Sequence, residues 1–164
     1  MRLPRTTRSN RSPSVPDTTA PSPRNKALDL LARREHSVAE LRAKLLVREF
    51  EPDTVELAID QLVHEGLVSD ERFADAFVTA RARKGQGPVK IRAELSQRGV
   101  ADGLIETSIG EVDVDWFAIA RQVRERKYGE QSPTDYKERA RQSRFLQSRG
   151  FTMEQISGAF RPDH

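Results

Sequence analysis

Hydrophobic residues recur at spacings of three and four from Asn25 onward, which is the spacing of helices that bury one face. Sustained alternation of apolar and polar residues, the pattern of a half-buried strand, is missing from the sequence. The chain is therefore predicted to be all-α. Two of the predicted apolar stripes consist of Val55, Ala58, Ile59 and Leu62, and of Phe73, Ala76, Phe77 and Ala80.

Start and stop signals divide this helical pattern into three cycles of three helices. Ser37 and Glu40 form the capping-box pattern that begins a helix, and Ser69 and Thr152 are further predicted N-caps. A glycine just past the last apolar residue ends a helix, as expected at Gly150.

One motif recurs in each cycle and indicates an internal repeat. Its arginines are 50 and 51 residues apart, in Leu45-x-x-Arg48-Glu49-Phe50, Leu95-x-x-Arg98-Gly99-Val100 and Leu146-x-x-Arg149-Gly150-Phe151. Units this small gain stability by stacking on one another, so we expect tandem three-helix repeats in an elongated, curved array. The expected units are a tail over residues 1–23, repeat 1 over 24–67, repeat 2 over 68–112 and repeat 3 over 113–164.

Composition excludes several classes of protein. Among 164 residues there is no cysteine, so disulfides, Cys-ligated zinc, iron–sulfur clusters and thiol nucleophiles are excluded. The sequence has no run of 18 apolar residues and no apolar segment in its first 24 residues, so neither a membrane span nor a secretory signal is expected. A cytoplasmic monomer is the expectation. The tail is rich in proline and arginine and lacks apolar periodicity, which predicts disorder.

Catalytic and metal-binding patterns are not found in the sequence. Glu35, His36 and Ser37 are adjacent, whereas a triad needs side chains from separate segments. Gly85 and Gly87 resemble half of a phosphate loop without the lysine and hydroxyl that would complete it. The three histidines are not spaced as ligand pairs. We therefore expect a protein that is not an enzyme and that needs no metal or cofactor.

The net charge of +3 conceals charge blocks. Residues 81–98 carry six basic residues and one acidic residue, and residues 121–149 carry nine basic and four acidic residues. Solvated helix faces would explain any single cation, but the blocks favour a surface for an acidic partner, either a phosphate backbone or a protein–nucleic acid assembly. The candidate residues are Arg81, Arg83, Lys84, Lys90, Arg92, Arg98, Arg121, Arg124, Arg126, Lys127, Arg141 and Arg144.

Several segments resemble the RecX family of bacterial recombination regulators over about residues 24–160. The resemblance rests on Arg34-Glu35-His36-Ser37, Gly66-Leu67-Val68-Ser69-Asp70-Glu71-Arg72-Phe73-Ala74, Lys84-Gly85-Gln86-Gly87-Pro88 and Arg149-Gly150-Phe151. It implies an all-α protein that lies in the groove of the RecA filament on single-stranded DNA and inhibits filament growth, ATP hydrolysis and strand exchange. It also implies contact with single-stranded DNA, and double-stranded DNA is a further candidate partner.

Two other classes of function fit the residues. A helical-repeat DNA-binding protein acting without RecA predicts tight binding to naked duplex with a preferred sequence. A pure protein scaffold predicts an affinity for its partner that is insensitive to DNA.

Overall fold

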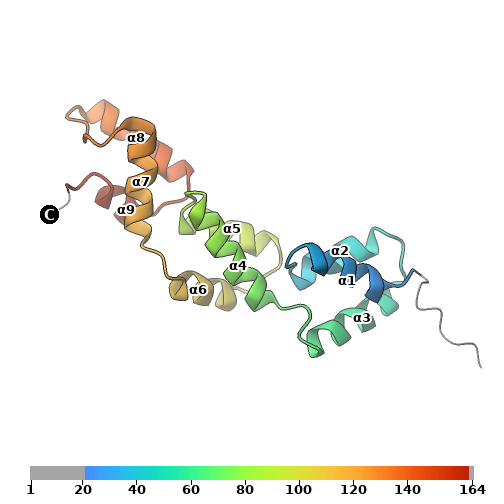
Figure 1. The fold of residues 1–164 in the computed structure, drawn as a ribbon. Coiled ribbons are helices and arrows are strands. Elements are labelled where there is room, and N and C mark those ends of the chain that lie inside the picture. The colour runs from blue at the N-terminus through green and yellow to red at the C-terminus, as the bar shows by residue number, and fades with distance from the viewer. Residues whose placement is uncertain (1–20, 163–164) are drawn as a thin grey trace, which may run out of the picture.

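The computed structural model describes residues 21–162, which contain nine α-helices and no strand. The helices form three groups that follow one another along an elongated molecule (Figure 1). Whenever two helices are in extensive contact, both belong to the same group. The helices are α1 (Pro23–Arg33), α2 (Val38–Leu46), α3 (Pro52–His64), α4 (Asp70–Arg83), α5 (Pro88–Gln97), α6 (Asp102–Glu111), α7 (Trp116–Tyr128), α8 (Tyr136–Ser148) and α9 (Met153–Gly158). The prediction of an all-α fold of three-helix repeats is confirmed.

Side-chain caps begin helices where the sequence predicted them. Ser37 Oγ accepts from the Glu40 backbone N–H at 3.0 Å, and the Glu40 carboxylate accepts from the Ser37 N–H, which completes a capping box. Ser69 caps α4, and Thr152 caps α9 with a second capping box. Each cap satisfies backbone N–H groups that the first turn of a helix leaves without an internal partner.

Each repeat has a small core of its own. The motif leucines Leu45, Leu95 and Leu146 are fully buried, one in each of the three cores. The predicted stripe of α4 is partly wrong, because its buried face consists of Phe73, Ala74, Val78 and Ala82, whereas Ala76 and Ala80 are exposed. Alanine suits either face of a helix, so the apolar pattern misassigned the two faces of α4.

The recurring motif ends its helix in a Schellman turn. Gly99 has a φ of +78°, its N–H bonds to Ser96 O, and the Val100 N–H bonds to Leu95 O at 3.2 Å. Gly150 repeats this arrangement at the end of α8, with a φ of +94°. The motif leucine and the residue after the glycine are therefore the two ends of one hydrogen bond that closes the helix.

Both junctions between repeats are built on these turns. Ser37 at the start of α2 donates through Oγ to Arg98 O at 2.7 Å, and a Cβ on Gly99 would lie 2.5 Å from the Cβ of Ala39. The backbone N–H groups of Gly87 and Val89 at the start of α5 donate to Arg149 O and Gly150 O at 2.8 and 2.9 Å. The start of the second helix of one repeat thus docks on the end of the second helix in the next repeat.

The expected tail over 1–23 falls mostly outside the described residues. Ser22 caps α1 and Pro23 is its first residue, so the first helix begins one residue before the expected start of repeat 1. Proline suits this position, because the first turn of a helix does not use its backbone N–H groups internally.

Candidate nucleic-acid interface

The predicted cations separate into groups once their neighbours are known. Five of them are ion-paired with carboxylates. These pairs are Arg81 with Glu94 at 3.2 Å, Arg92 with Glu106, Arg98 with Glu40 at 3.2 Å, Arg124 with Glu125 at 3.7 Å, and Arg141 with Glu138 at 3.3 Å. A carboxylate at this distance neutralises much of the charge that a phosphate would meet.

The Arg92–Glu106 pair belongs to the repeat architecture. Arg92 Nη2 lies 3.1 Å from Glu106 Oε2 in a two-pronged arrangement, and Arg42 and Glu56 form the same arrangement in repeat 1. Hydrogen bonding with Arg92 lowers the pKa of the Glu106 carboxyl and raises that of the arginine. Arg92 therefore joins α5 to α6 and is a weak candidate for DNA contact.

Two of the paired arginines stack on the same aromatic ring. The guanidinium carbons of Arg81 and Arg98 lie 4.6 and 4.9 Å from the centre of the Phe77 ring. Because Arg98 also reaches Glu40 of repeat 1, it helps to close the first junction.

The structure corrects the interpretation of Arg124. Its side chain is 2% exposed, so it cannot meet a DNA backbone on the surface. The guanidinium donates to Ala159 O at 2.9 Å and to the carbonyls of Gly129, Glu130 and Gln131. Arg124 therefore holds the loop between α7 and α8 against the end of α9.

A second group gathers at the junction between repeats 2 and 3. Arg83 and Lys84 end α4, and Arg126 and Lys127 lie in the last turn of α7. All four are exposed, and neither Arg83 nor Arg126 has a side-chain hydrogen bond or ion pair with any described residue. We call these four residues the junction cluster.

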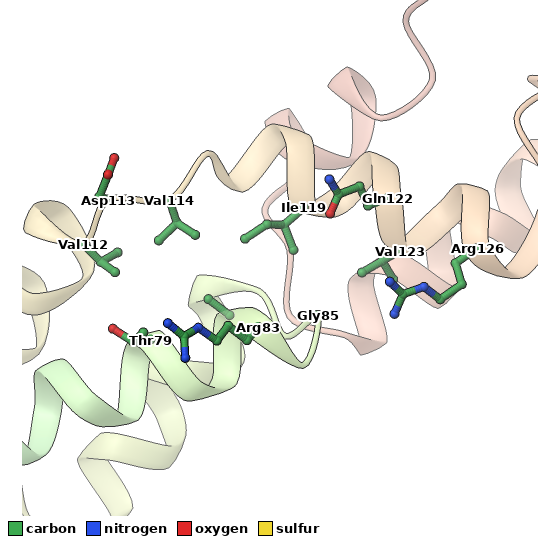
Figure 2. Close-up of a pocket in the computed structure, with 11 residues that line it drawn as sticks. Thr79, Arg83, Gly85, Val112, Asp113, Val114, Ile119, Gln122, Val123 and Arg126 are labelled. Atoms are coloured by element: carbon green, nitrogen blue, oxygen red, sulfur yellow. The ribbon is translucent and has the colours of Figure 1, made fainter.

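The junction cluster borders a cavity of about 310 Å³. Figure 2 shows Arg83 from α4 and Arg126 from α7 on opposite walls, with Ile119 between them, and Val112 and Val123 also line the cavity. Lys127 continues the positive charge beyond Arg126, and its Nζ lies 4.0 Å from the centre of the Phe145 ring. Cations from two repeats and an apolar hollow therefore share one surface.

The remaining candidates lie apart from this cluster. Lys90 is half-buried on α5, where its Cβ faces Gly150. Arg144 is exposed on α8. Arg121 lies on α7 and lines another hollow together with Arg124.

Sequence reasoning did not place Arg149 among the candidates. Its guanidinium donates to Lys84 O at 2.7 Å and to Gly85 O at 3.3 Å, which fixes the end of α4 against repeat 3. The recurrence of an arginine in the repeat motif was the available signal. Thr79 and Gln122 line the cavity but belong to no motif, so the sequence carried no signal that could have identified them.

The described residues contain neither a cluster of metal ligands nor a membrane-spanning helix. Within residues 21–162, no three histidine, aspartate or glutamate side chains gather as a metal site would require. None of the helices described is both long and apolar enough to cross a membrane.

Comparison with known families matches the three repeats one by one. The models for the first, second and third three-helix domains of RecX match residues 24–62, 69–109 and 113–160. Over 136 residues the chain is 50% identical to the regulatory protein RecX of Halorhodospira halophila (strain DSM 244 / SL1), covering 83% of this chain and 84% of that protein. It is 48% identical over 134 residues to the regulatory protein RecX of Pseudomonas fluorescens (strain SBW25), covering 82% and 86%.

Solved structures share the fold. The crystal structure of RecX from Lactobacillus salivarius superposes with a TM-score of 0.72 at 21% identity, covering 84% of this chain and 91% of that one. A second crystal structure, of a regulatory protein RecX, gives a TM-score of 0.68 at 20% identity, covering 82% of this chain and 70% of that one.

Proposed function

The chain belongs to the RecX family of regulatory proteins, and on this premise we propose that it inhibits the RecA recombinase. It binds along the groove of the RecA filament on single-stranded DNA and limits filament growth, ATP hydrolysis and strand exchange. The observation that carries this proposal is the junction cluster, which presents exposed cations from two repeats where repeats 2 and 3 of the elongated array meet.

The contrast between the two junctions supports this placement. At the first junction Arg98 pairs with Glu40 and Arg72 pairs with Glu35, so carboxylates of repeat 1 neutralise cations of repeat 2. At the second junction neither Arg83 nor Arg126 forms an ion pair with a carboxylate of any described residue. An acidic partner is therefore attracted to the second junction more than to the first.

An elongated array also suits inhibition at low ratios of inhibitor to RecA. Repeats in series can contact neighbouring subunits of a filament at once, which hinders the movements that accompany nucleotide turnover or the addition of new subunits. One stalled site then affects a whole growing filament.

The decisive measurement is DNA-dependent ATP hydrolysis by RecA after addition of this protein well below equimolar. We expect a progressive fall in rate that high salt weakens, because the contacts are partly electrostatic. The double variant Arg83→Glu/Arg126→Glu should inhibit less than the wild type. Arg33→Glu/Lys137→Glu is the matched control, because it makes the same charge change at exposed residues of α1 and α8 outside the junction cluster.

ATP hydrolysis together with two binding measurements, to duplex DNA and to RecA with and without single-stranded DNA, separates the alternatives. The proposal would be falsified by constant turnover at equimolar protein while the same preparation binds duplex DNA tightly, which favours a DNA-binding protein acting without RecA. Association with RecA that is unchanged when DNA is removed would instead favour a protein scaffold.

A further inference from the structure

We propose that the cavity at the second junction receives one unstacked base of single-stranded DNA, and that this makes the junction cluster prefer single strands to duplex. The inference rests on the proposed function, because it assumes that this surface meets nucleic acid. It adds a chemical class of ligand and a specificity.

The cavity has the size and lining of a small-ligand site. Its volume of about 310 Å³ lies at the lower end of the usual range for such sites. Five apolar side chains from α4, the α6–α7 linker and α7 line it, namely Ala82, Val112, Val114, Ile119 and Val123. An apolar floor of this kind accepts the flat face of a base without selecting among the four bases.

Positive charge flanks the apolar floor. Figure 2 shows Arg83 and Arg126 on opposite walls, whereas the carboxylate of Asp113 points away from the cavity. Phosphates on either side of an inserted base would meet these two guanidinium groups. Backbone cations combined with a platform for bases are the usual construction of surfaces that bind single strands without sequence preference.

Polar groups on the lining suit the edge of a base. Thr79 carries a hydroxyl and Gln122 an amide, and each of these groups both donates and accepts hydrogen bonds. They can therefore pair with the donors and acceptors of any base. In a duplex those edges are already paired and stacked, so a base enters only from a single strand or after unpairing.

A neighbouring hollow extends the same surface. It shares Gly85, Val123 and Arg126 with the first cavity and adds Lys127 and the ring of Phe145. Because the Lys127 ammonium lies over the Phe145 ring, this hollow offers the next nucleotide a cation for its phosphate beside an apolar surface. The path of a single strand would then run from Arg83 past Arg126 to Phe145.

The test fills the cavity without changing its charge. Thr79→Phe fills it from α4, and Gln122→Trp fills it from α7 if the first variant fails to fold. Thr107→Phe, at an exposed position of α6, is the matched control for Thr79→Phe. The probes are a short oligothymidine and a duplex of equal length, with affinity followed by fluorescence anisotropy at one salt concentration.

We expect the wild type to bind the single strand more tightly than the duplex. Thr79→Phe and Gln122→Trp should lose about tenfold in affinity for the single strand, near the lower end of what one stacked base contributes. Their affinity for the duplex should be unchanged, as should both affinities of Thr107→Phe.

The inference is overturned if the wild type binds both probes equally well. It is also overturned if the filled variants keep the wild-type ratio of single-strand affinity to duplex affinity. RecA ATP hydrolysis, measured on the same preparations, keeps this outcome separate from failure of the proposed function. Inhibition without strand preference overturns only the base site, and strand preference without inhibition overturns only the function. If Thr79→Phe loses inhibition but keeps its affinity for the single strand, the cavity holds a protein side chain instead of a base.

Discussion

Glu49 has a φ of +62°, a backbone conformation that residues with a Cβ adopt at a cost. It stands where the other two repeats have Gly99 and Gly150. Those glycines also allow close approach of Ala39 and Lys90 from the preceding repeat. Among residues 21–162 no repeat precedes repeat 1, so the described structure places only the backbone demand of the positive φ on Glu49.

Glu49→Gly should therefore stabilise the protein. We expect the free energy of unfolding to rise by about 1 kcal/mol, because glycine adopts a positive φ without steric strain. Urea unfolding followed by circular dichroism measures the change. Glu71→Gly, on the exposed side of the first turn of α4, is the control and should lower the same quantity by roughly 0.5–1 kcal/mol. A loss of stability in Glu49→Gly would contradict the argument.

His36 is predicted to make stability depend on pH. Its ring is buried, with Nδ1 3.0 Å from Arg34 O and Nε2 2.9 Å from Lys44 Nζ. In the neutral tautomer that donates from Nδ1, Nε2 accepts from the lysine ammonium, whereas a protonated ring would face it as a second cation. Burial is the largest cause that lowers the pKa of His36 in the folded protein.

The sign of the effect follows from this shift. The unfolded chain binds a proton near the ordinary histidine pKa of about 6.5, and the folded protein binds it only at lower pH. The stability that the neutral His36 contributes is thus fully present above about pH 6.5 and is lost as the pH falls below it. Between pH 7.5 and 5.5, the free energy of unfolding measured in urea should fall less in His36→Gln than in the wild type. His64→Gln, at an exposed position, should behave as the wild type does.

At the scale of single helices, the junction turns carry a prediction about Gly150. A Cβ at this position would be strained by the φ of +94° and would also meet the Cβ and backbone N of Lys90. Gly66 ends α3 in the same kind of Schellman turn with a φ of +71°, but a Cβ there would meet nothing within 4 Å. The two glycines therefore share the conformational demand and differ in the close approach.

Gly150→Ala should lower the free energy of unfolding by more than Gly66→Ala. For Gly66→Ala we expect about 1–2 kcal/mol, the cost of a left-handed conformation. The excess in Gly150→Ala measures the contact between repeats 2 and 3, and urea unfolding of both variants gives it directly. Equal losses would show that the junction adjusts to an added methyl group.

The helices were predictable because their signals are local. Ser37 with Glu40, and the leucine and glycine of the repeat motif, lie within one turn of each other, so short-range chemistry decides them. Whether an arginine is exposed, ion-paired or buried depends on partners that are distant in the sequence. Arg92 meets a carboxylate 14 residues away, and Arg124 is buried beneath the last helix although it lies two residues from the exposed Arg126.

At the scale of the whole molecule, three small cores replace one large core. The repeats meet through turns and helix starts, and their extensive helix packing is internal. Such an array exposes much surface for its size, which suits a protein that follows a filament. The tandem repeats were visible in the sequence as a motif recurring about every 50 residues, but the joining of Arg83 and Arg126 at one cavity required the fold.

Charge removal at that cavity should change how binding depends on salt. Each phosphate that a cation neutralises on single-stranded DNA contributes roughly 0.7 to the slope of log affinity against log salt. Arg83→Glu/Arg126→Glu should therefore reduce the magnitude of the slope by about 1.4 or more for a single-stranded oligonucleotide. Arg92→Gln is the control, because Glu106 already pairs with this arginine, and its slope should match that of the wild type. Anisotropy titrations at several salt concentrations give both slopes. If the slope fell in Arg92→Gln and held in the double variant, DNA would run along α5 and α6, and the junction cluster would not be its binding surface.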